Sequence, residues 1–341
     1  MDLQTFQLQF NQFFQKLLKE KLAVYAQFTH DPLQPEYIDQ LLNIAAGGKR
    51  IRPYLCALLT HADEISLVPD TTLRIAAALE LFHLFALVHD DIIDRSDARH
   101  ATTTIHTFIQ QTLEKNHRMG DSRHTGVSLA LLWGDILLTL VHELVHDARD
   151  TLAPRVLNSV RNVLFEMTHE VVAGQMIDVS IPTLQDVDEA LLYQKNLLKT
   201  ARYTFVRPMQ IGACLQNADD TIMKFCSNFG ETIGTAFQVQ DDLLDVIGDE
   251  AVTGRPVLSD LSERQQTVLT QYVKKHGSKE QRLVLEQAFG TSCFTLEEKI
   301  DIKRAFTESG AVDYAQKLVQ DSYDSALKQI ADSPLSDSCN T

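Results

Sequence analysis

Two short acidic motifs of identical spacing are the residues best suited to chemistry in this chain of 341 residues. The first is Asp90-Asp91-Ile92-Ile93-Asp94 and the second is Asp241-Asp242-Leu243-Leu244-Asp245, so both follow the pattern D-D-x-x-D. On a helix, residues i and i+4 share a face and residue i+1 lies beside them, so each motif projects two or three carboxylates from one turn. Such clustered carboxylates repel one another, and folding does not favour them. They suit magnesium, which takes a few carboxylates together with the phosphates of a substrate.

The presence of two copies distinguishes a metal site from a solvated helix face. A single D-D-x-x-D on a helix is as often a solvated face as a site. Both copies here follow apolar sequence, Leu84 to Val88 and Ile233 to Phe237, so both helices are expected to be buried. Acidic clusters at the ends of buried helices need cations. The pair therefore predicts two walls of one site that clamps a polyphosphate through metal ions.

Basic residues that suit a diphosphate occur at two points of the chain. Lys49 and Arg52 follow Gly47-Gly48 and are three residues apart, which predicts one face of the first turn of a helix. Free N–H groups and the helix dipole attract anions there. Taken alone, this pair is equally well explained as a solvated basic turn. Arg99 follows Asp94 closely enough to reach a ligand bound there.

Polar residues inside apolar segments are the remaining candidates. Lys199-Thr200 is expected in a polar break between apolar helices, and Gln175 and Asp178 lie three residues apart within another helix. A buried Gln and Asp need polar partners, so they belong either to a packing network or to the lining of a pocket. His83 lies seven residues before Asp90, and a lone histidine there is more often a core residue than a ligand.

Composition excludes several classes of partner. The formal net charge of −15 argues against nucleic acid and against an anionic lipid surface, because both demand basic residues. Zinc-type His/Cys spacing and nucleotide-binding glycine motifs are missing from the sequence. Five scattered cysteines predict reduced, mostly buried thiols of a cytoplasmic protein. Residues 1–30 are amphipathic, and the most apolar window, Val127 to Leu140, is too short to cross a bilayer, so no transmembrane segment is expected.

Helical periodicity runs through the whole chain and must position the motifs. A polar loop is expected at 95–104, and helix from Ile105 should yield near Gln111 to a polar stretch that ends at Gly126. This stretch is interpreted as an exposed loop or a helix extension, with a solvated loop favoured. The other expected helices are 2–28, a short one between Pro35 and Gly47, one opening at Lys49, 71–94, 127–147, 155–181, 187–217, 219–247, 262–275, 278–289 and 295–331. Since neither strand alternation nor a linker is found, the chain is interpreted as one all-α domain over residues 1–341.

In this order the motifs resemble those of the trans-prenyl diphosphate synthases, the polyprenyl synthetase family. The resemblance covers nearly the whole chain, and two aspartate motifs with these intervening pieces are highly specific. The pieces are Gly47 to Pro53, His83, Asp90 to Asp94, Arg99, Thr103 to His106, Gly134-Asp135, Gly174 to Asp178, Lys199-Thr200, Phe237 to Asp245 and Gly254 to Thr267.

The resemblance implies an isoprenoid-synthase helical bundle around a deep central cavity, usually as a homodimer. It implies magnesium-dependent, head-to-tail condensation of isopentenyl diphosphate with an allylic diphosphate, which is dimethylallyl, geranyl or farnesyl diphosphate. Three magnesium ions are implied once the substrate diphosphate is bound. By position, the metal ligands would be Asp90, Asp94 and Asp241, supported by Asp91, Asp242 and Asp245.

The same resemblance assigns the residues that would hold the substrates. The allylic diphosphate would be held by Arg99, Lys199 and Arg255, and the isopentenyl diphosphate by Lys49, Arg52 and His83. The catalytic positions near the reacting carbons would be Thr200, Gln175, Asp178 and Gln238, together with Lys199.

This sequence departs from the family pattern in two loops. After the first motif the family has Arg-Arg-Gly, whereas this chain has Arg99-His100-Ala101, and the second Arg normally binds isopentenyl diphosphate. The later loop of the family reads G-K-P-x-G-x-D-L-x-E-G-K. Here Arg255 replaces the first Lys, Leu258 replaces a Gly, and Gln265 aligns with the second Lys. Because Arg and Lys are not interchangeable and His100 is a weaker cation, we expect low affinity for isopentenyl diphosphate rather than inactivity.

Residues just before the first motif limit product length in this family. The residue five before Asp90 is Phe85, about 7.5 Å down the helix, and the residue four before is Ala86. By helical angle alone Ala86 faces the cavity better, so the blocking role of Phe85 rests on the resemblance. A single aromatic residue with a small neighbour resembles geranylgeranyl synthases of one type, with farnesyl synthases next.

Three other functions compete with a synthase. A class I terpene cyclase of the same fold usually carries an N-S-E type second motif, unlike Asp241 to Asp245. A non-catalytic subunit of a heteromeric synthase typically loses an aspartate motif, but the changes at His100 and Gln265 keep this reading open. A helical scaffold with solvated acidic clusters would leave the matching basic residues unexplained.

Overall fold

The computed structural model describes residues 2–28, 30–60, 68–99, 102–184, 187–250, 257–291, 293–333 and 335. Almost all of this described part is helical, which confirms the predicted all-α class. The exception is a hairpin of two-residue strands, β1 (Ala98–Arg99) and β2 (Thr102–Thr103), paired antiparallel directly after the first aspartate motif.

Contacts between residues divide the chain into two compact units. The first unit is Met1–Arg161 with Ile211–Asn217, and the second is Asn162–Gln210 with Ala218–Thr341. The first aspartate motif therefore belongs to one unit and the second motif to the other. A single domain over residues 1–341 stays a prediction.

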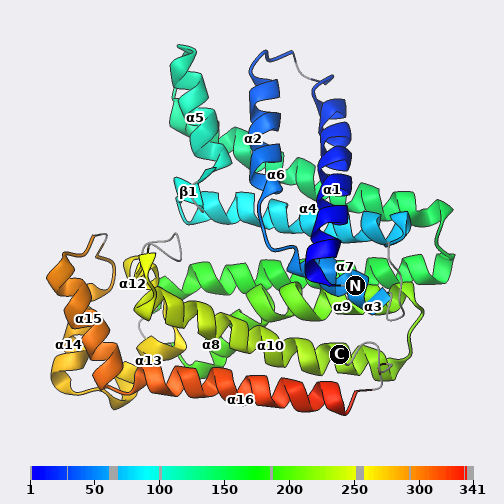
Figure 1. Cartoon of the computed structure of the whole chain (residues 1–341). Helices are drawn as coiled ribbons and strands as arrows, with labels where there is room; N and C mark the ends of the chain where they lie inside the picture. Colours follow the sequence, from blue (N-terminus) through cyan, green and yellow to red (C-terminus); the bar gives the residue numbers. More distant parts are fainter. Residues whose placement is uncertain are drawn as a thin grey trace. The chain divides into compact units, whose positions relative to one another are not determined.

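The first unit is built around one apolar helix. Its helices are α1 (Leu3–Tyr25), α2 (Gln34–Ala46), α3 (Ile51–Thr60), α4 (Asp70–Ile93), α5 (Ile105–Lys115), α6 (Ser122–Asp147) and the short η1 (Ala148–Asp150). Helix α4 packs against α6, α3 and α1, and it is buried on most sides from Leu73 to Phe85 (Figure 1). Phe6, Phe10 and Phe14 of α1 form a fully buried stack with ring centroids 5.3 and 5.4 Å apart. Helix α1 contacts α4 near its beginning, where Arg74 lies over the ring of Phe13.

The second unit is built around a second long helix, α10 (Asp220–Ile247), which packs between η3 and α16 (Figure 1). Its other elements are the later part of α7 (Pro154–Ser180), η2 (Ile181–Thr183), α8 (Glu189–Asn196), the π-helix η3 (Leu197–Val206), the start of α9 (Arg207–Leu215), α12 (Ser259–Ser262), α13 (Val268–His276), α14 (Lys279–Ala288), α15 (Leu296–Glu308) and α16 (Ala311–Ala331). Val239, Leu243 and Val246 of α10 are buried in its core, so the apolar face of α10 sets the direction of the second motif.

Several predicted boundaries are wrong. Helix α3 begins at Ile51, and Arg50 before it has a φ of 57°, so Lys49 precedes the helix and shares no helical face with Arg52. The polar break predicted at Lys199 and Thr200 is wrong, since both residues lie in the π-helix η3. Helical structure therefore continues from Glu189 to Leu215. The segment 295–331 forms two helices, since Gly310 has a φ of 84° and ends the first.

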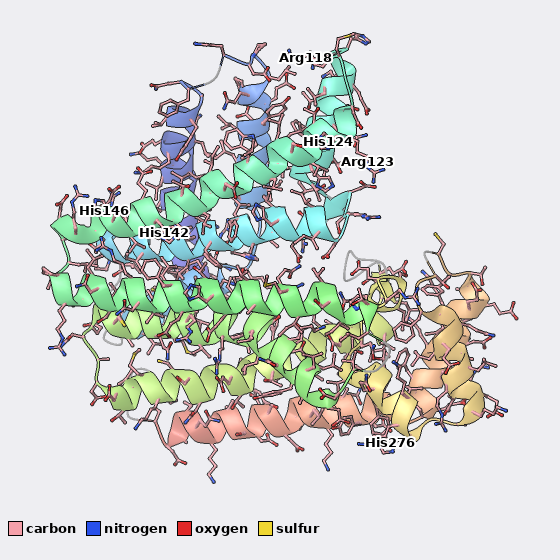
Figure 2. The ribbon with its side chains drawn as sticks, turned by 180° about the vertical axis from the view of Figure 1, so that it is seen from behind. Arg118, Arg123, His124, His142, His146 and His276 are labelled. Atoms are coloured by element: carbon pink, nitrogen blue, oxygen red, sulfur yellow. The ribbon has the colours of Figure 1, made fainter. Side chains whose placement is uncertain are left out.

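The polar stretch from Gln111 to Gly126 is helical at both of its ends, as one of the two alternatives for it predicted. Helix α5 continues to Lys115 because Leu113 is buried, and α6 already begins at Ser122. The turn between them carries Arg118, which pairs with Asp31 at 2.7 Å. Figure 2 shows Arg118, Arg123 and His124 around this end of the α5–α6 pair.

Two of the described helices, Asp70–Ile93 and Ser122–Asp150, are long and apolar enough to cross a membrane by length and composition alone. The predicted apolar window of α6 was therefore too short. In the first helix 72% of the apolar window is buried, and in the second 39%. Core helices of soluble proteins have the same length and composition, so the absence of a transmembrane segment stays a prediction.

Cysteines behave largely as expected. Cys56, Cys214 and Cys226 are buried free thiols, whereas Cys293 is exposed. Burial raises the pKa of the Cys56 thiol to about 12, so this thiol is unreactive at neutral pH. The fifth cysteine, Cys339, lies outside the described residues.

Candidate functional site

The first aspartate motif ends helix α4, and its carboxylates have different surroundings. Asp91 is buried, Asp90 is partly exposed, and Asp94 is the C-cap residue of the helix. Arg99, on strand β1, donates to both: its Nε lies 2.8 Å from Asp91 Oδ1 and its Nη2 lies 3.1 Å from Asp90 Oδ2. The β1–β2 hairpin thus turns the arginine predicted to bind a diphosphate back onto the motif.

Burial sets the protonation of this pair. Burial raises the pKa of Asp91 to about 6, even though Arg99 acts in the opposite direction. The pKa of Arg99 is raised in turn, because its two aspartate partners outweigh burial. Arg99 therefore binds both aspartates, of which Asp91 is buried and Asp90 is partly exposed.

His83 lies on the same helix as the first motif, and three arginines from other segments act on it. Burial, followed by the charges of Arg52, Arg99 and Arg50, keeps the pKa of His83 well below its usual value. The imidazole is therefore neutral at pH 7, and it acts as a hydrogen-bonding group rather than as a cation. Lys49, predicted to bind with it, is exposed.

Arg50 was not among the predicted site residues, and it holds the loop that carries Lys49. Its guanidinium is buried and bonds Glu80 Oε1 at 2.6 Å, Asn11 Oδ1 at 2.7 Å and the carbonyl of Ala45 at 2.6 Å. Removal of Glu80 would leave this charge buried and unpaired, which costs roughly 3–5 kcal/mol. Of the basic residues in Lys49-Arg50-Ile51-Arg52, Arg50 is thus structural.

Phe85 lies one helical turn before His89. It is buried, and its ring packs edge-on against Phe82 and His89, with centroids 5.4 and 4.8 Å apart. His89 in turn lies against Gly134 of α6, where a side chain would collide with the imidazole. Phe85 is therefore held rigidly by neighbours on α4 itself.

The second aspartate motif ends helix α10 and repeats the division between exposed and buried carboxylates. Asp241 is exposed, whereas Asp242 is buried and accepts a hydrogen bond from Gln238 Nε2 at 2.8 Å. Burial raises the pKa of Asp242 to about 7, although Gln238 and Lys195 act in the opposite direction. Asp241 is the better-placed ligand for a cation.

Asp245, the last residue of this motif, anchors the following loop. Its carboxylate accepts hydrogen bonds from the backbone N–H of Ser259 at 2.9 Å, from the Ser259 hydroxyl at 2.6 Å and from the N–H of Asp260 at 3.3 Å. Its carbonyl accepts from the N–H of Leu258 at 2.8 Å. Both carboxylate oxygens of Asp245 are therefore used within the protein.

A lysine pair flanks Asp178 of α7. Lys199 Nζ lies 2.5 Å from Asp178 Oδ2, and Lys195 Nζ lies 3.3 Å from Oδ1. Although burial acts in the opposite direction, Lys199 and Lys195 lower the pKa of Asp178, so this carboxylate is ionised. Lys195 was missed in the sequence, although its place four residues before Lys199 on one helix could have indicated it.

Close backbone approach brings these groups together. A Cβ at Gly174 of α7 would lie 2.5 Å from the backbone N of Lys199, and one at Gly234 of α10 would collide with Ala201. Both glycines thus let the long helices α7 and α10 touch the π-helix η3. π-helical turns are frequent at functional sites. The i and i+3 pair Gln175 and Asp178 lies on the helix next to this contact.

Thr200, also on η3, links the π-helix to the second motif. Its hydroxyl donates to Gln238 Oε1 at 2.8 Å, and Gln238 Nε2 donates to Asp242. The structure therefore brings together Thr200, Gln238 and Asp242 in one chain of hydrogen bonds, and Asp178 with Lys199 in another.

The later of the two loops that depart from the family pattern has two residues other than glycine with a left-handed backbone. Leu258 and Arg264, which align with two glycines of that pattern, have φ angles of 63° and 61°. Both residues stand in the left-handed region, which costs roughly 1–2 kcal/mol for a residue other than glycine. Gln265 has a buried Oε1 that accepts no hydrogen bond from any residue described here. His100 and Arg255 lie outside the described residues.

The arrangement of the carboxylates suits magnesium ions that are bound partly by the protein and partly by the substrate. Over the described ranges, no group of three or more His, Cys, Asp or Glu side chains is arranged to hold a metal by itself. In the first motif Asp90 and Asp94 are partly exposed beside the buried Asp91. In the second motif the exposed Asp241 lies beside the buried Asp242. Magnesium binds in this way, through one or two carboxylates plus substrate phosphates, rather than in a protein cage.

Comparison with known proteins gives one consistent result. A model of the family described as "Polyprenyl synthetase" matches residues 35–308. A geranylgeranyl diphosphate synthase of Saccharolobus solfataricus is 28% identical over 85% of this chain and 82% of that protein. A geranylfarnesyl diphosphate synthase of Aeropyrum pernix is 33% identical over 80% of each chain. A crystal structure of geranylgeranyl pyrophosphate synthase from Corynebacterium glutamicum, complexed with isoprenyl diphosphate and magnesium, is 29% identical, covers 100% of this chain and 96% of its own, and has a TM-score of 0.88.

Proposed function

Because this chain belongs to the polyprenyl synthetase family and is a prenyltransferase, we propose that it joins an allylic diphosphate head to tail with isopentenyl diphosphate to make a short-chain trans-prenyl diphosphate. The allylic substrate is dimethylallyl, geranyl or farnesyl diphosphate. The observation that carries the proposal is the match over residues 35–308, within which both aspartate motifs are complete.

Each aspartate motif has a role at the allylic diphosphate. Asp90, Asp94 and Asp241 are the chief magnesium ligands, and Arg99, Lys199 and Arg255 contact the diphosphate. Three ions are expected with substrate bound. Asp91 and Asp242 support the ligands from buried positions, and Asp245 supports them by holding the loop after α10. That the two motifs serve the same diphosphate stays a prediction.

The chemistry begins when the allylic C–O bond breaks and its electron pair leaves with the diphosphate. Magnesium, when bound, neutralises the charge that develops on the leaving oxygens. Lys199 supplies a further positive charge, and Asp178 holds it in position through their 2.5 Å contact. The double bond of isopentenyl diphosphate then attacks the allylic cation, a C–C bond forms, and the departing diphosphate takes the proton that is lost.

The allylic cation needs electron-rich but weakly nucleophilic neighbours. The Thr200 hydroxyl donates a hydrogen bond to Gln238, so its oxygen lone pairs remain available to a developing positive charge. Water would capture the cation, so the tail must lie in an apolar cavity. Gln175 is expected to line the same region.

Isopentenyl diphosphate is held by Lys49, Arg52 and neutral His83. Because His83 is neutral, it contributes a hydrogen bond to the diphosphate, while Lys49 and Arg52 supply the positive charge. Phe85 limits the product, with geranylgeranyl diphosphate favoured and farnesyl diphosphate next.

The enzyme is expected to be a cytoplasmic homodimer. Leu131 and Leu132 of α6 are 44% and 56% exposed, as expected of a helix face that a second copy covers. Light scattering coupled to size-exclusion chromatography measures the mass, and a mass near 38.4 kDa would rule out the dimer.

A product assay tests the proposed reaction. Purified protein receives magnesium, labelled isopentenyl diphosphate and each of the three allylic starters in turn, followed by chain-length analysis. Asp241→Asn should lower turnover by roughly a hundredfold or more. Asp220→Asn, in the exposed first turn of the same helix, is the control and should leave turnover unchanged. The absence of any elongation, even at high isopentenyl diphosphate, would contradict the proposal.

A further inference from the structure

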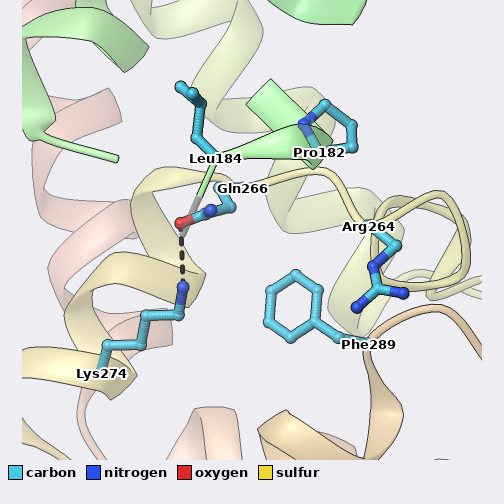
Figure 3. A pocket seen from close by; sticks show the side chains of 6 residues that line it. All are labelled: Pro182, Leu184, Arg264, Gln266, Lys274 and Phe289. Atoms are coloured by element: carbon cyan, nitrogen blue, oxygen red, sulfur yellow. Dashed lines mark hydrogen bonds between the residues drawn. The ribbon is translucent and has the colours of Figure 1, made fainter. Parts of the chain in front are cut away.

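We propose a second oxyanion site in the second unit, in the cleft between η2, the loop before α13, and the end of α14. The cleft encloses about 150 Å³ and is lined by Pro182, Leu184, Arg264, Gln266, Lys274 and Phe289 (Figure 3). Two of these six residues are cationic and none is acidic. None of them is assigned to the prenyl transfer.

Arg264 provides the first observation. Within the described part of the chain its guanidinium makes no ion pair and no hydrogen bond, although the chain as a whole carries a net charge of −15. Its side chain passes over Gly290, where a Cβ would approach the guanidinium to 3.2 Å. The backbone at Arg264 is held in the left-handed region, and strain of this kind concentrates at ligand-binding positions.

Gln266 provides the second observation. Its Oε1 accepts hydrogen bonds from Gln271 Nε2 at 2.7 Å and from Lys274 Nζ at 2.9 Å, so both lone pairs are used. Two donors on one oxygen fix the orientation of the amide and leave Nε2, a donor, as the group that Gln266 can offer to a ligand. Figure 3 shows the amide oxygen turned toward Lys274.

Lys274 is fixed in place as well. Its ammonium lies 5.2 Å from the centroid of the Phe289 ring, in addition to its bond with Gln266. The side chains that the cleft offers to a ligand are therefore donors and cations: a guanidinium, an ammonium and an amide N–H. Such a set selects a ligand whose polar atoms are all acceptors, which is a phosphate-type oxyanion.

The apolar wall narrows the ligand class further. Phe289, Leu184 and Pro182 add carbon surface next to the donors, and Figure 3 shows the Phe289 ring between Lys274 and Arg264. We assign the ligand as a diphosphate, either inorganic or carried by a short isoprenoid. This choice of diphosphate rests on the proposed function, whereas the oxyanion site itself rests on the geometry alone.

Calorimetry of inorganic diphosphate binding to the full chain in EDTA tests the site, because EDTA removes the magnesium that is proposed to hold diphosphate at the aspartate motifs. Arg264→Gly suits the left-handed backbone, and Lys274→Met keeps the alkyl stem on Phe289, so both variants should fold. Each should raise the Kd roughly tenfold or more, as the loss of one charge-assisted hydrogen bond predicts. Any binding at the cations proposed for the prenyl transfer site, Lys49, Arg52, Arg99, Lys199 and Arg255, is common to all variants and does not alter the comparison.

Lys275→Met is the matched control, since Lys275 is adjacent on the same helix, 65% exposed, and paired with Glu189 at 3.4 Å. It should leave the Kd within about twofold of the native value. Equal Kd values in all four proteins, or an equal loss in Lys275→Met, would overturn the proposal.

A second titration with isopentenyl diphosphate distinguishes the two sources of the diphosphate. If the apolar wall is used, the prenyl compound should lose more affinity than inorganic diphosphate in Phe289→Ala. An equal loss assigns the site to inorganic diphosphate. Since these titrations need no turnover, a failure of the prenyl transfer assay leaves their result intact.

Discussion

The hydroxyl of Thr200 lies 2.8 Å from the amide oxygen of Gln238, and the amide nitrogen of Gln238 lies 2.8 Å from Asp242 Oδ1. Because Gln238 in this relay donates to Asp242 through its amide nitrogen, it turns its amide oxygen, which only accepts, toward Thr200. The Thr200 hydroxyl then has to donate, which leaves its lone pairs for the substrate. The relay connects a π-helix residue with the second aspartate motif.

We expect Thr200→Val to lower kcat by roughly tenfold to a hundredfold, with a smaller change in KM, because the hydroxyl oxygen acts on charge that exists only in the transition state. Valine keeps the shape of threonine, so packing is little changed. Steady-state kinetics with farnesyl diphosphate measures the effect. Thr200→Ser, which keeps the hydroxyl, is the control. A kcat lost equally in both variants would argue for a packing role.

The raised pKa of Asp242 predicts that the stability of the magnesium-free protein depends on pH. The pKa of Asp242 is raised from 3.8 to about 7 by burial, so between these values the folded state binds a proton that the unfolded state has lost. The free energy of unfolding contributed by this group therefore falls as the pH rises from 4 to 7. Asp242→Asn does not titrate, and in EDTA it should gain stability relative to the native chain across this window. Urea unfolding at several pH values measures the difference, and a difference independent of pH would contradict the assignment.

Phe85→Ala should lengthen the product, because removal of the ring opens space below the first motif. Chain-length analysis after reaction with farnesyl diphosphate and excess isopentenyl diphosphate reports the change. Phe82→Leu, at the fully buried ring in edge-on contact with Phe85, controls for general loosening of the core. An unchanged product distribution in Phe85→Ala would remove Phe85 as the limit.

His100→Arg should lower KM for isopentenyl diphosphate severalfold to tenfold, because a permanent guanidinium replaces a histidine where the family has arginine. The residue lies outside the described part of the chain, so this expectation comes from the sequence alone. His124→Arg, at an exposed position on α6, adds the same charge elsewhere and should have no effect. A KM that stays constant in His100→Arg would show that this departure does not limit binding.

Glycine at the two left-handed positions of the departing loop should have opposite effects. Arg264 is exposed, so Arg264→Gly relieves the backbone and should raise the free energy of unfolding by up to ~1 kcal/mol. Leu258 is fully buried in the core of the second unit, so Leu258→Gly should lower it by roughly 2–4 kcal/mol despite the same relief. Thermal and urea unfolding distinguish these results. A destabilised Arg264→Gly would show that the arginine side chain stabilises the loop.

Much of the fold of this protein can be predicted from the local pattern of its sequence. The 3.6-residue periodicity predicted the helical class and the long helices α4 and α10, because a buried helix face must repeat at that spacing. The spacing D-D-x-x-D predicted two carboxylate clusters at helix ends, and both clusters end their helices as expected. The helix limits that failed lie where a backbone angle or a π-helix decides, as at Arg50, Gly310 and Lys199.

The roles within each cluster were decided only by tertiary structure. Periodicity says which residues share a face, but it does not say what lies opposite that face. Asp91 and Asp242 are buried by the fold, whereas Asp90 and Asp241 are more exposed, although the motif letters are identical. The carboxylate of Asp245 is bound within the protein by Ser259 and Asp260. Likewise Lys195, Arg50 and Arg264 look like ordinary surface cations in the sequence. Lys195 and Arg50 are paired with Asp178 and Glu80, which lie in other segments of the chain, and Arg264 is placed by the loop before α13. The local pattern does not determine these contacts, because only folding decides which distant side chains meet.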